Sequence, residues 1–266
     1  MADHYAVIGN PVGHSQSPRI HALFAAQCRQ DMDYSALLAP LESFVTTARQ
    51  FAAAGGLGVN VTVPFKEQAY RLADTLTPRA KAARAVNTLS FQPGRIAGDN
   101  TDGAGLVRDL TVNHRCTIRD KRVLLLGAGG GARGVVLPLL AEQPALLAIA
   151  NRDSDKAARL AEDFPGTRAS GFADLAGQSF DLVINATSAG LSGAELPLPP
   201  GIFAAGGLAY EMLYGRETPF MARARDAGAE VADGLGMLVE QAAEAFWVWR
   251  GMRPDTAPIL AALENA

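Results

Sequence analysis

A buried strand that runs directly into a glycine-rich turn constrains this chain more than any other feature. Residues 123–126 form an uninterrupted apolar run, which is typical of a strand covered on both faces of its sheet. The sequence GAGGGA follows at once over residues 127–132, and a helical pattern continues to about Leu140. A strand, a glycine-rich turn and a helix in this order form the dinucleotide-binding fingerprint. The order favours a nucleotide-binding α/β unit over its alternative, an ordinary tight turn.

Small residues have a physical purpose in such a turn. Gly127 permits the tight turn, Gly129 lets the backbone approach a pyrophosphate, and the amides that open the following helix point at that anion. The motif departs from a strict GxGxxG, so its position between strand and helix supports the interpretation more than its letters do. The predicted cofactor contacts in this stretch are Gly127, Ala128, Gly129, Gly130, Gly131 and Ala132.

The end of the next strand distinguishes NAD from NADP. An NAD enzyme usually places an acidic residue there for the ribose hydroxyls, whereas an NADP enzyme places a basic one for the 2′-phosphate. This chain has Asn151, Arg152 and Asp153, with Lys156 one turn later. Arg152 can hold phosphate with its planar fork, or it can be a solvated arginine at a helix start. We predict NADP, with the Asp153 carboxylate capping the helix instead of facing the ligand.

Apolar runs alternate with helical patterns along the whole length, which indicates α/β architecture. In the first part we expect strands at 5–8, 34–38 and 57–61, a hairpin of 86–91 with 95–99, and helices at 18–30, 41–54 and 64–73. In the second part we expect strands at 123–126, 146–150, 182–185, 207–212 and 230–232, and helices ending near 140 and spanning 154–164, 238–250 and 254–264. We place one domain at 1–101 and a second at 102–237, with 238–266 packing back on the first.

Composition narrows the class of protein further. Apolar residues make up 48% and charged residues 19%, a profile typical of a folded globular chain. The net charge is −3 without a long basic run, and no apolar stretch could span a bilayer, so we expect neither nucleic acid nor membrane as a partner. Cys28 and Cys116 lack metal-ligand spacing, so no metal is expected. The start of the chain does not resemble a signal peptide, and a cytoplasmic location is the expectation.

Four stretches of the first domain place polar or charged groups at strand ends and loops. They are GNPVGHSQSP at 9–18, NVTVPFK at 60–66, AVNTL at 85–89 and GDNTDG at 98–103. Together with NATSAG at 185–190, the segment from Tyr214 to Phe220 and ADGLGMLVEQA at 232–242, they closely resemble the shikimate dehydrogenase family. The resemblance covers nearly the whole chain.

The resemblance implies a substrate domain, a Rossmann domain and a cleft between them. It also implies reversible, NADP-dependent reduction of 3-dehydroshikimate to shikimate, a step of aromatic amino-acid (chorismate) biosynthesis. Matched by motif, the catalytic pair is Lys66 and Asp102. The substrate-binding residues are Ser15, Ser17, Asn60, Thr62, Asn87, Tyr214 and Gln241, with the two serines at the carboxylate. Further cofactor contacts are Asn185, Ala186, Thr187, Met212 and Gly234.

The chemistry of the catalytic pair agrees with that reaction. Hydride transfer to a ketone creates an alkoxide, which needs a proton donor, and Lys66 can supply the proton. Asp102 can orient the ammonium group and accept a hydrogen bond from a ring hydroxyl. The alternatives are a surface lysine at a helix start and an aspartate that caps a helix.

Two other functions share this fold. One is a quinate/shikimate dehydrogenase that uses NAD, which Arg152 and the paired serines argue against. The other is a catalytically silent ligand sensor, which has no need for a proton donor such as Lys66. A homodimer is left open as an assembly, because nothing in the sequence decides the oligomeric state.

Overall fold

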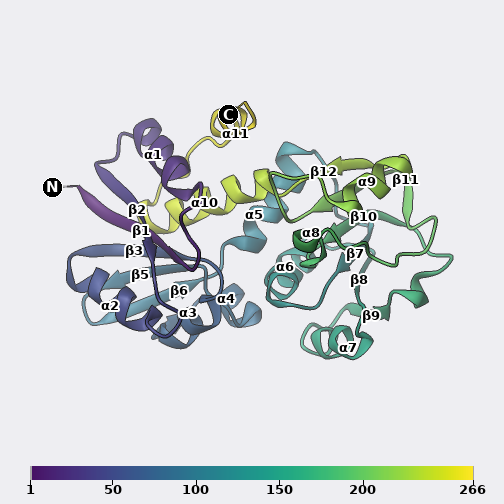
Figure 1. Ribbon diagram of the computed structural model, residues 1–266, viewed down its shortest axis with the longest axis horizontal. Coiled ribbons are helices and arrows are strands. Elements are labelled where there is room, and N and C mark those ends of the chain that lie inside the picture. The colour runs from purple at the N-terminus through teal and green to yellow at the C-terminus, as the bar shows by residue number, and fades with distance from the viewer. Residues whose placement is uncertain (1, 266) are drawn as a thin grey trace. The chain divides into compact units, whose positions relative to one another are not determined.

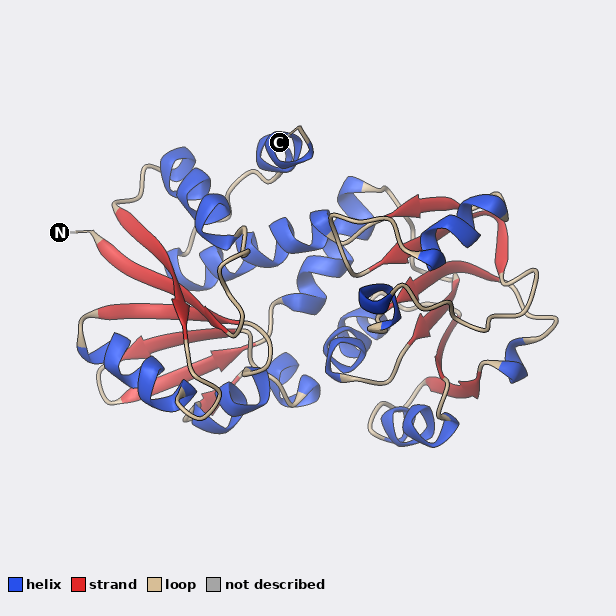
Figure 2. Ribbon diagram, viewed as in Figure 1, coloured by secondary structure: helices blue, strands red, loops and turns tan. Residues whose placement is uncertain are grey.

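The computed structural model describes residues 2–265 and divides into two compact units (Figure 1). One unit comprises the chain up to Gly105 together with the segment from Leu238 onward, and the other comprises Leu106–Met237. Each unit contains a six-stranded sheet with helices packed on it (Figure 2). The α/β architecture expected from the sequence is therefore confirmed.

The first unit has a mixed sheet. Its strands lie in the order β2 (Met32–Leu38), β1 (Asp3–Gly9), β3 (Gly56–Val61), β5 (Thr88–Gln92), β6 (Arg95–Asp99) and β4 (Thr75–Leu76). β1 pairs in parallel with β2 and β3, whereas β5 is antiparallel to both β3 and β6. The β5–β6 pair is the predicted hairpin, and Gly94 in its turn has a φ of +71°, which glycine adopts without strain.

Both faces of this sheet are covered. The helices are α1 (Ser17–Cys28), α2 (Phe44–Ala53), α3 (Lys66–Leu72), α4 (Pro78–Ala83), α5 (Asp102–Arg108), α10 (Leu235–Arg250) and α11 (Ala257–Glu264). Ala6 and Ile8 of β1 pack in one core with α2 and α3, whereas Tyr5, which points to the opposite face, stacks on Trp249 of α10. On that second side α1, α10 and α11 share a core of their own. Residues 238–266 supply most of α10 and all of α11.

The second unit has an entirely parallel sheet. Its strands lie in the order β12 (Glu230–Ala232), β11 (Phe203–Glu211), β10 (Phe180–Asn185), β7 (Arg122–Leu126), β8 (Leu146–Asn151) and β9 (Thr167–Gly171). Its helices are α6 (Gly130–Ala141), α7 (Ser154–Glu162), α8 (Ala189–Ser192) and α9 (Pro219–Asp226), and a π-helical turn spans Asp109–Asn113. From β7 the chain builds the sheet outward in one direction through β8 and β9, and then from β10 in the other direction, which is the doubly wound Rossmann order. Ligands of such sheets bind at the carboxyl ends of the strands, beside the point where the direction changes.

Most elements lie within a few residues of their expected positions, but several short ones were not predicted. The helices α4 and α9 both begin at a proline after a threonine whose hydroxyl accepts a backbone N–H, a start signal that the prediction overlooked. The helix α5 begins inside the GDNTDG stretch, and Gly103 and Gly105 lower its helical propensity. Gly105 is nevertheless needed there, because a Cβ at this position would lie 2.7 Å from the Cβ of Gln241 on α10. The helix expected from residue 41 begins only at Phe44, and the one expected from 254 begins at Ala257.

Among residues 2–265, every helix is too short or too polar to cross a lipid bilayer.

Candidate functional site

In the first unit, the predicted residues gather around the carboxyl ends of β1 and β3. These strands are parallel neighbours, so the loops that follow them leave the sheet at the same edge. The two loops touch: the Asn10 amide donates to the Val63 carbonyl at 3.0 Å, and a Cβ added to Gly9 would lie 2.4 Å from the Thr62 methyl group. Gly9 therefore allows the loop that carries the predicted serines to lie against Thr62.

Lys66 and Asp102 form a direct ion pair. Lys66 is the first residue of α3 and Asp102 is the first residue of α5, and Lys66 Nζ donates to Asp102 Oδ2 at 2.7 Å. The lysine side chain is 32% exposed and the aspartate side chain 16%, so the pair is partly covered but open to a small molecule. Both carboxylate oxygens of Asp102 accept side-chain hydrogen bonds, from Lys66 and from Asn87, whereas Asn100 Oδ1 accepts the Asp102 amide at the start of α5, at 3.1 Å.

Asn87 fixes the other oxygen of that carboxylate. Its Nδ2 donates to Asp102 Oδ1 at 2.8 Å and to Thr101 Oγ1 at 2.9 Å, and it reaches Gln241 Oε1 at 3.4 Å. Asn87 Oδ1 accepts the Thr101 amide at 2.8 Å. Predicted residues from four separate stretches, Lys66, Asn87, Asp102 and Gln241, are thus joined by direct hydrogen bonds.

Asn60 belongs to the same cluster through buried contacts. It accepts a hydrogen bond on Oδ1 from the Tyr34 hydroxyl at 2.7 Å, and its Nδ2 donates to the Asn87 carbonyl and to Thr88 Oγ1, both at 3.1 Å. Both amide hydrogens are therefore already used within the protein. A substrate hydroxyl could only donate to the remaining lone pair of Asn60 Oδ1.

The two predicted serines lie in the loop between β1 and α1. Ser17 is buried, Ser15 is half-buried, and Ser15 Oγ accepts the Ser17 amide at 3.3 Å. Their loop lies against Thr62, one residue beyond β3. Tyr214, the remaining residue predicted for the substrate, is half-buried in the loop after β11 of the second unit.

In the second unit, the glycine turn has the geometry that its sequence predicts. Gly127 has a φ of +110°, and a Cβ at this position would lie 3.1 Å from the Ala186 carbonyl oxygen. Gly129 precedes the first turn of α6, and Gly129 to Gly131 are exposed, whereas Ala132 is fully buried. The backbone of residues 128–131 is therefore open to a ligand, and the Ala132 side chain contributes to packing.

A hollow of about 330 Å³ opens beside this turn, and both cations predicted for the 2′-phosphate region, Arg152 and Lys156, line it. It is lined by Ala128, Gly129, Asn151, Arg152, Asp153 and Lys156. Arg152 also lines a second hollow of about 280 Å³ that continues along residues 187–197. Among the described residues, neither Arg152 nor Lys156 forms an ion pair with a carboxylate, so both cations can meet an anion.

Asp153 caps α7 as predicted. Its carboxylate accepts the amides of Asp155 and Lys156 at 3.1 and 3.3 Å. Asn151 Nδ2 in turn donates to the Asp153 carbonyl at 3.0 Å. The negative charge next to Arg152 is therefore directed to the helix start, where it interacts favourably with the helix dipole.

Asn185 lies next to the glycine turn but is buried and held by a residue that the sequence analysis missed. Its Nδ2 donates to Glu211 Oε2 at 2.7 Å, and its Oδ1 accepts the Thr187 hydroxyl at 2.7 Å. Glu211 also accepts the Thr218 hydroxyl at 2.9 Å and the Leu213 amide at 3.2 Å. Burial raises the pKa of Glu211, and these hydrogen bonds oppose that rise. Asn185 therefore shapes the loop, and any cofactor contact would come from the backbone or from Ala186 and Thr187.

Met212 and Gly234 also lie close to the turn. A Cβ added to Gly131 would lie 3.9 Å from Met212 Cε. A Cβ on Gly234 would lie 2.3 Å from the Met212 carbonyl oxygen, so only glycine fits there. The carboxyl-end loops of β7, β10 and β11 are thus packed together at one edge of the sheet.

His21 and the aromatic residues near the end of α10 have structural explanations. His21 is fully buried and stacks on Tyr34 with ring centroids 4.1 Å apart, and burial lowers its pKa to about 3, so it is neutral at physiological pH. Of the aromatic residues near the end of α10, Phe246 is fully buried and Trp249 donates to the Leu89 carbonyl at 3.2 Å. Trp247, by contrast, is 49% exposed.

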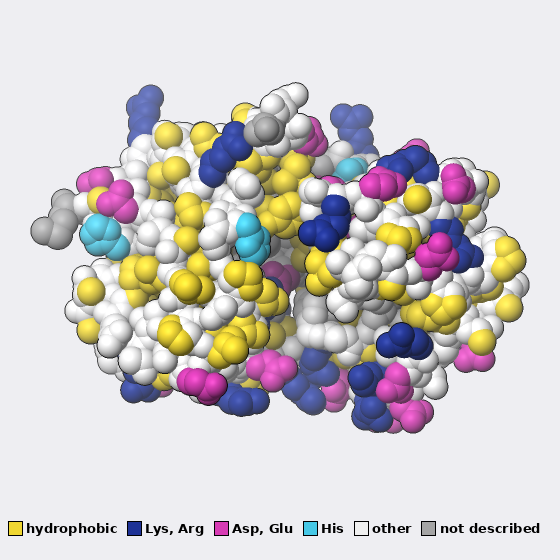
Figure 3. Space-filling view, in the orientation of Figure 1, with side chains coloured by type: hydrophobic (Ala, Val, Ile, Leu, Met, Phe, Trp, Pro, Cys, Tyr) yellow, Lys and Arg dark blue, Asp and Glu magenta, His cyan; other side chains and the backbone are white. Residues whose placement is uncertain are grey.

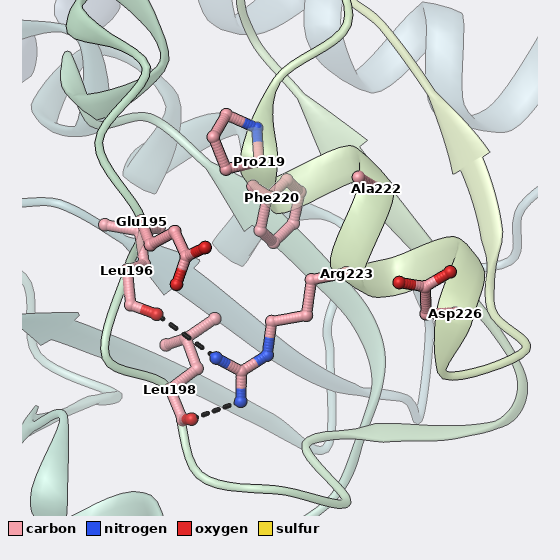
Figure 4. A pocket seen from close by; sticks show the side chains of 8 residues that line it. All are labelled: Glu195, Leu196, Leu198, Pro219, Phe220, Ala222, Arg223 and Asp226. Carbon is pink, nitrogen blue, oxygen red and sulfur yellow. Dashed lines mark hydrogen bonds between the residues drawn. The ribbon is translucent and has the colours of Figure 1, made fainter.

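Basic and acidic side chains are interspersed on the face shown in Figure 3. A third hollow of about 390 Å³ lies between α9 and residues 195–198 (Figure 4). Its arginine, Arg223, donates to the Leu196 and Leu198 carbonyls, as the dashed lines in Figure 4 show. Arg223 therefore fastens this segment to α9.

Comparison with known families gives three matches along the chain. Residues 7–89 match the shikimate dehydrogenase substrate binding domain, residues 110–192 match the shikimate/quinate 5-dehydrogenase family, and residues 234–264 match the shikimate 5'-dehydrogenase C-terminal domain. The stretches that carry the sequence resemblance fall mostly within these matches.

Whole-chain comparisons agree with the domain matches. A protein of Dechloromonas aromatica named shikimate dehydrogenase (NADP(+)) is 62% identical over 268 residues, which cover 99% of this chain and 98% of the relative. The crystal structure of an Ael1 enzyme from Pseudomonas putida is 49% identical, with a TM-score of 0.94 and coverage of 98% of both chains. A shikimate 5-dehydrogenase from Thermus thermophilus, in complex with NADP(H) and shikimate, is 34% identical, with a TM-score of 0.89 and coverage of 99% of both chains.

Proposed function

The chain belongs to the shikimate dehydrogenase family, and we propose that it catalyses the reversible reduction of 3-dehydroshikimate to shikimate with NADPH. The observation that supports this most directly is the Lys66–Asp102 pair, joined at 2.7 Å and partly open to solvent. A ketone reductase needs a proton donor at the reacting oxygen, and a pure ligand-binding protein does not.

The residues of the second unit fit NADP(H). The exposed backbone of residues 128–131 suits a pyrophosphate, and Arg152 and Lys156 suit the 2′-phosphate. When bound, NADPH supplies the hydride. The capping role of Asp153 supports NADP over NAD, because its carboxylate is occupied by backbone amides and does not compete for the ribose.

In the proposed mechanism, the side chains of the first unit hold the substrate and deliver the proton. Ser15 and Ser17 bind the carboxylate of the substrate. The ring hydroxyls bind to the Asp102 carboxylate, Thr62, Gln241 and the free lone pair of Asn60. Lys66 Nζ donates a proton to the substrate oxygen as the hydride reaches its carbon, so that C=O becomes CH–OH, and Asp102 holds the ammonium group in place. Solvent then returns the proton to Lys66.

We further propose that the chain up to residue 101 together with residues 238–266 is the substrate domain and that 102–237 is the cofactor domain. The enzyme would act in the cytoplasm on free small molecules, in the biosynthesis of aromatic amino acids.

The test is a spectrophotometric assay of the purified chain. NADPH absorbance should fall when 3-dehydroshikimate is added and should rise when shikimate is mixed with NADP⁺. The same assay with NADH, and with quinate in the oxidative direction, separates the proposal from an NAD-using quinate dehydrogenase. A protein that binds shikimate but leaves NADPH and NADH unchanged would instead be a ligand sensor, and the proposal would fail.

A further inference from the structure

Thr88 lies among the site residues of the first unit. Neither the sequence pattern nor the family resemblance assigns this residue a role. It is the first residue of β5, and the strand register pairs it with Asn60 of β3 on one side and with Asp99 of β6 on the other. Residues directly opposite each other on neighbouring strands point to the same face of a sheet. The Thr88 side chain is fully buried, so it cannot touch a substrate.

The Thr88 hydroxyl bridges two predicted substrate residues. It donates to Asn87 Oδ1 at 2.9 Å and accepts from Asn60 Nδ2 at 3.1 Å. A hydroxyl carries one hydrogen, so once it donates to Asn87 it can only accept from Asn60. The hydroxyl therefore couples the two amides: with the Asn87 oxygen toward it, which the Thr101 amide also requires, the Asn60 nitrogen must face it.

The orientation of Asn87 matters for the catalytic aspartate. With Oδ1 toward Thr88 and the Thr101 amide, Nδ2 faces Asp102 Oδ1 and donates to it at 2.8 Å. If the amide were reversed, its oxygen would face the carboxylate of Asp102 and its nitrogen would face the backbone N–H of Thr101, which can only donate. Both contacts would be unfavourable.

We propose, on the basis of the function proposed above, that Thr88 is a positioning residue that holds the amides of Asn60 and Asn87 and, through Asn87, the Asp102 carboxylate against Lys66. The chain of contacts runs from the Tyr34 hydroxyl through Asn60, Thr88 and Asn87 to Asp102, and every link is 3.1 Å or shorter. Buried polar groups that satisfy one another in this way specify a single arrangement.

The test compares Thr88→Val, which removes the hydroxyl and keeps the shape, with Thr88→Ser, which keeps the hydroxyl. Thr88→Val should lower kcat/KM for shikimate about tenfold, the effect of one buried hydrogen bond, and Thr88→Ser should restore most of it. The KM for NADP⁺ should not change. The matched control is Thr47→Val, because Thr47 also bonds through its hydroxyl, to the Ser43 carbonyl at 2.9 Å, but on α2 away from these residues.

A double-mutant cycle separates positioning from general stability. If Thr88 acts through Asn87, then Thr88→Val should have little further effect on kcat/KM in an Asn87→Ala background. Melting temperatures of all variants show whether folding is retained.

The proposal is overturned if wild-type protein is active and Thr88→Val, folded, has wild-type kcat/KM, or if Thr88→Ser fails to restore activity. Additive losses in the double mutant would also overturn it. An inactive wild-type protein would instead contradict the proposed function itself.

Discussion

The proposed substrate residues of the first unit and the proposed cofactor residues of the second, here called the two halves, are built in opposite ways. In the first unit the functional side chains bond mainly to one another: Asn60 and Asn87 are buried, and Asp102 receives hydrogen bonds from both Lys66 and Asn87. In the second unit the hollow is formed by the exposed backbone of the glycine turn and by Arg152 and Lys156, which are also exposed. In the first half, hydrogen bonds within the protein already hold the side chains in place before a ligand binds. In the second half, exposed backbone amides and two exposed cations are available to a ligand, and the side chains of these cations form no ion pair among the described residues.

The difference has consequences for how each half tolerates substitution. A preorganised polar cluster contributes most in the transition state, where its geometry need not be rebuilt, so removal of one member should affect turnover. An exposed cation contributes to binding in proportion to its contact with the ligand, so its loss should affect affinity and cofactor choice. Substitutions in the two halves should therefore change different kinetic parameters and differ in size.

The largest effect is expected from Lys66→Ala. The variant should lose turnover by about 10²–10⁴-fold, because a positioned proton donor contributes that much, while NADPH binding measured by fluorescence titration should stay close to wild type. Arg71→Ala is a suitable control, since Arg71 lies on the same helix and its ion pair with Glu67 is exposed. Near-normal turnover in Lys66→Ala would show that the ordered cluster is structural and would remove the contrast between the halves.

A smaller effect is expected from Ser15→Ala and Ser17→Ala. A hydrogen bond to a charged acceptor contributes about 1.5–3 kcal/mol, so each variant should raise the KM for shikimate by roughly ten- to a hundredfold. The KM for NADP⁺ should not change. Because Ser17 is buried at the start of α1, its thermal stability should be measured as well. An unchanged KM for shikimate in both folded variants would mean that the carboxylate is bound elsewhere.

The same contrast explains which features could be predicted from the sequence. The glycine turn and the Asp153 cap depend on residues within a few positions of each other, and both were predicted correctly. The Asn60–Thr88 contact depends on the register of β3 against β5, which joins residues 28 positions apart, and register is set by the whole sheet. Glu211 was missed for a similar reason, because its partner Asn185 is 26 positions away on another strand.

The short helices teach a different lesson. Thr77–Pro78 and Thr218–Pro219 are local start signals that could have been found, and each precedes an observed helix. The helix α5 could not, because Gly103 and Gly105 lower its intrinsic propensity. Packing of Gly105 against Gln241 compensates for that propensity, and the contact joins residues about half the chain apart.

In the second unit, Arg152→Ala should change cofactor choice. The variant should lose about ten- to a hundredfold in kcat/KM with NADP⁺, from the loss of charge-assisted hydrogen bonds to the 2′-phosphate, and almost nothing with NAD⁺. Lys156→Ala should have a weaker effect of the same kind, because lysine acts as a point charge without a planar fork. Equal losses with both cofactors would assign Arg152 to the shared part of the dinucleotide.

The smallest effect is expected from Asp153→Ala, although this substitution removes a charge adjacent to Arg152. The Asp153 carboxylate accepts the amides of Asp155 and Lys156 at 3.1 and 3.3 Å, so it acts on the helix and not on the ligand. Its loss should cost about 1 kcal/mol of unfolding free energy, as for other helix caps, and Asp153→Asn or Asp153→Ser should restore most of that stability. The preference for NADP⁺ over NAD⁺ should stay within about twofold of wild type, because the remaining effect is a screened interaction between exposed charges. Urea unfolding and kcat/KM with each cofactor measure the two effects separately. A wild-type preference for NAD⁺ that Asp153→Ala reverses would place the carboxylate at the ribose, and the second half of the site would then depend on a fixed side chain after all.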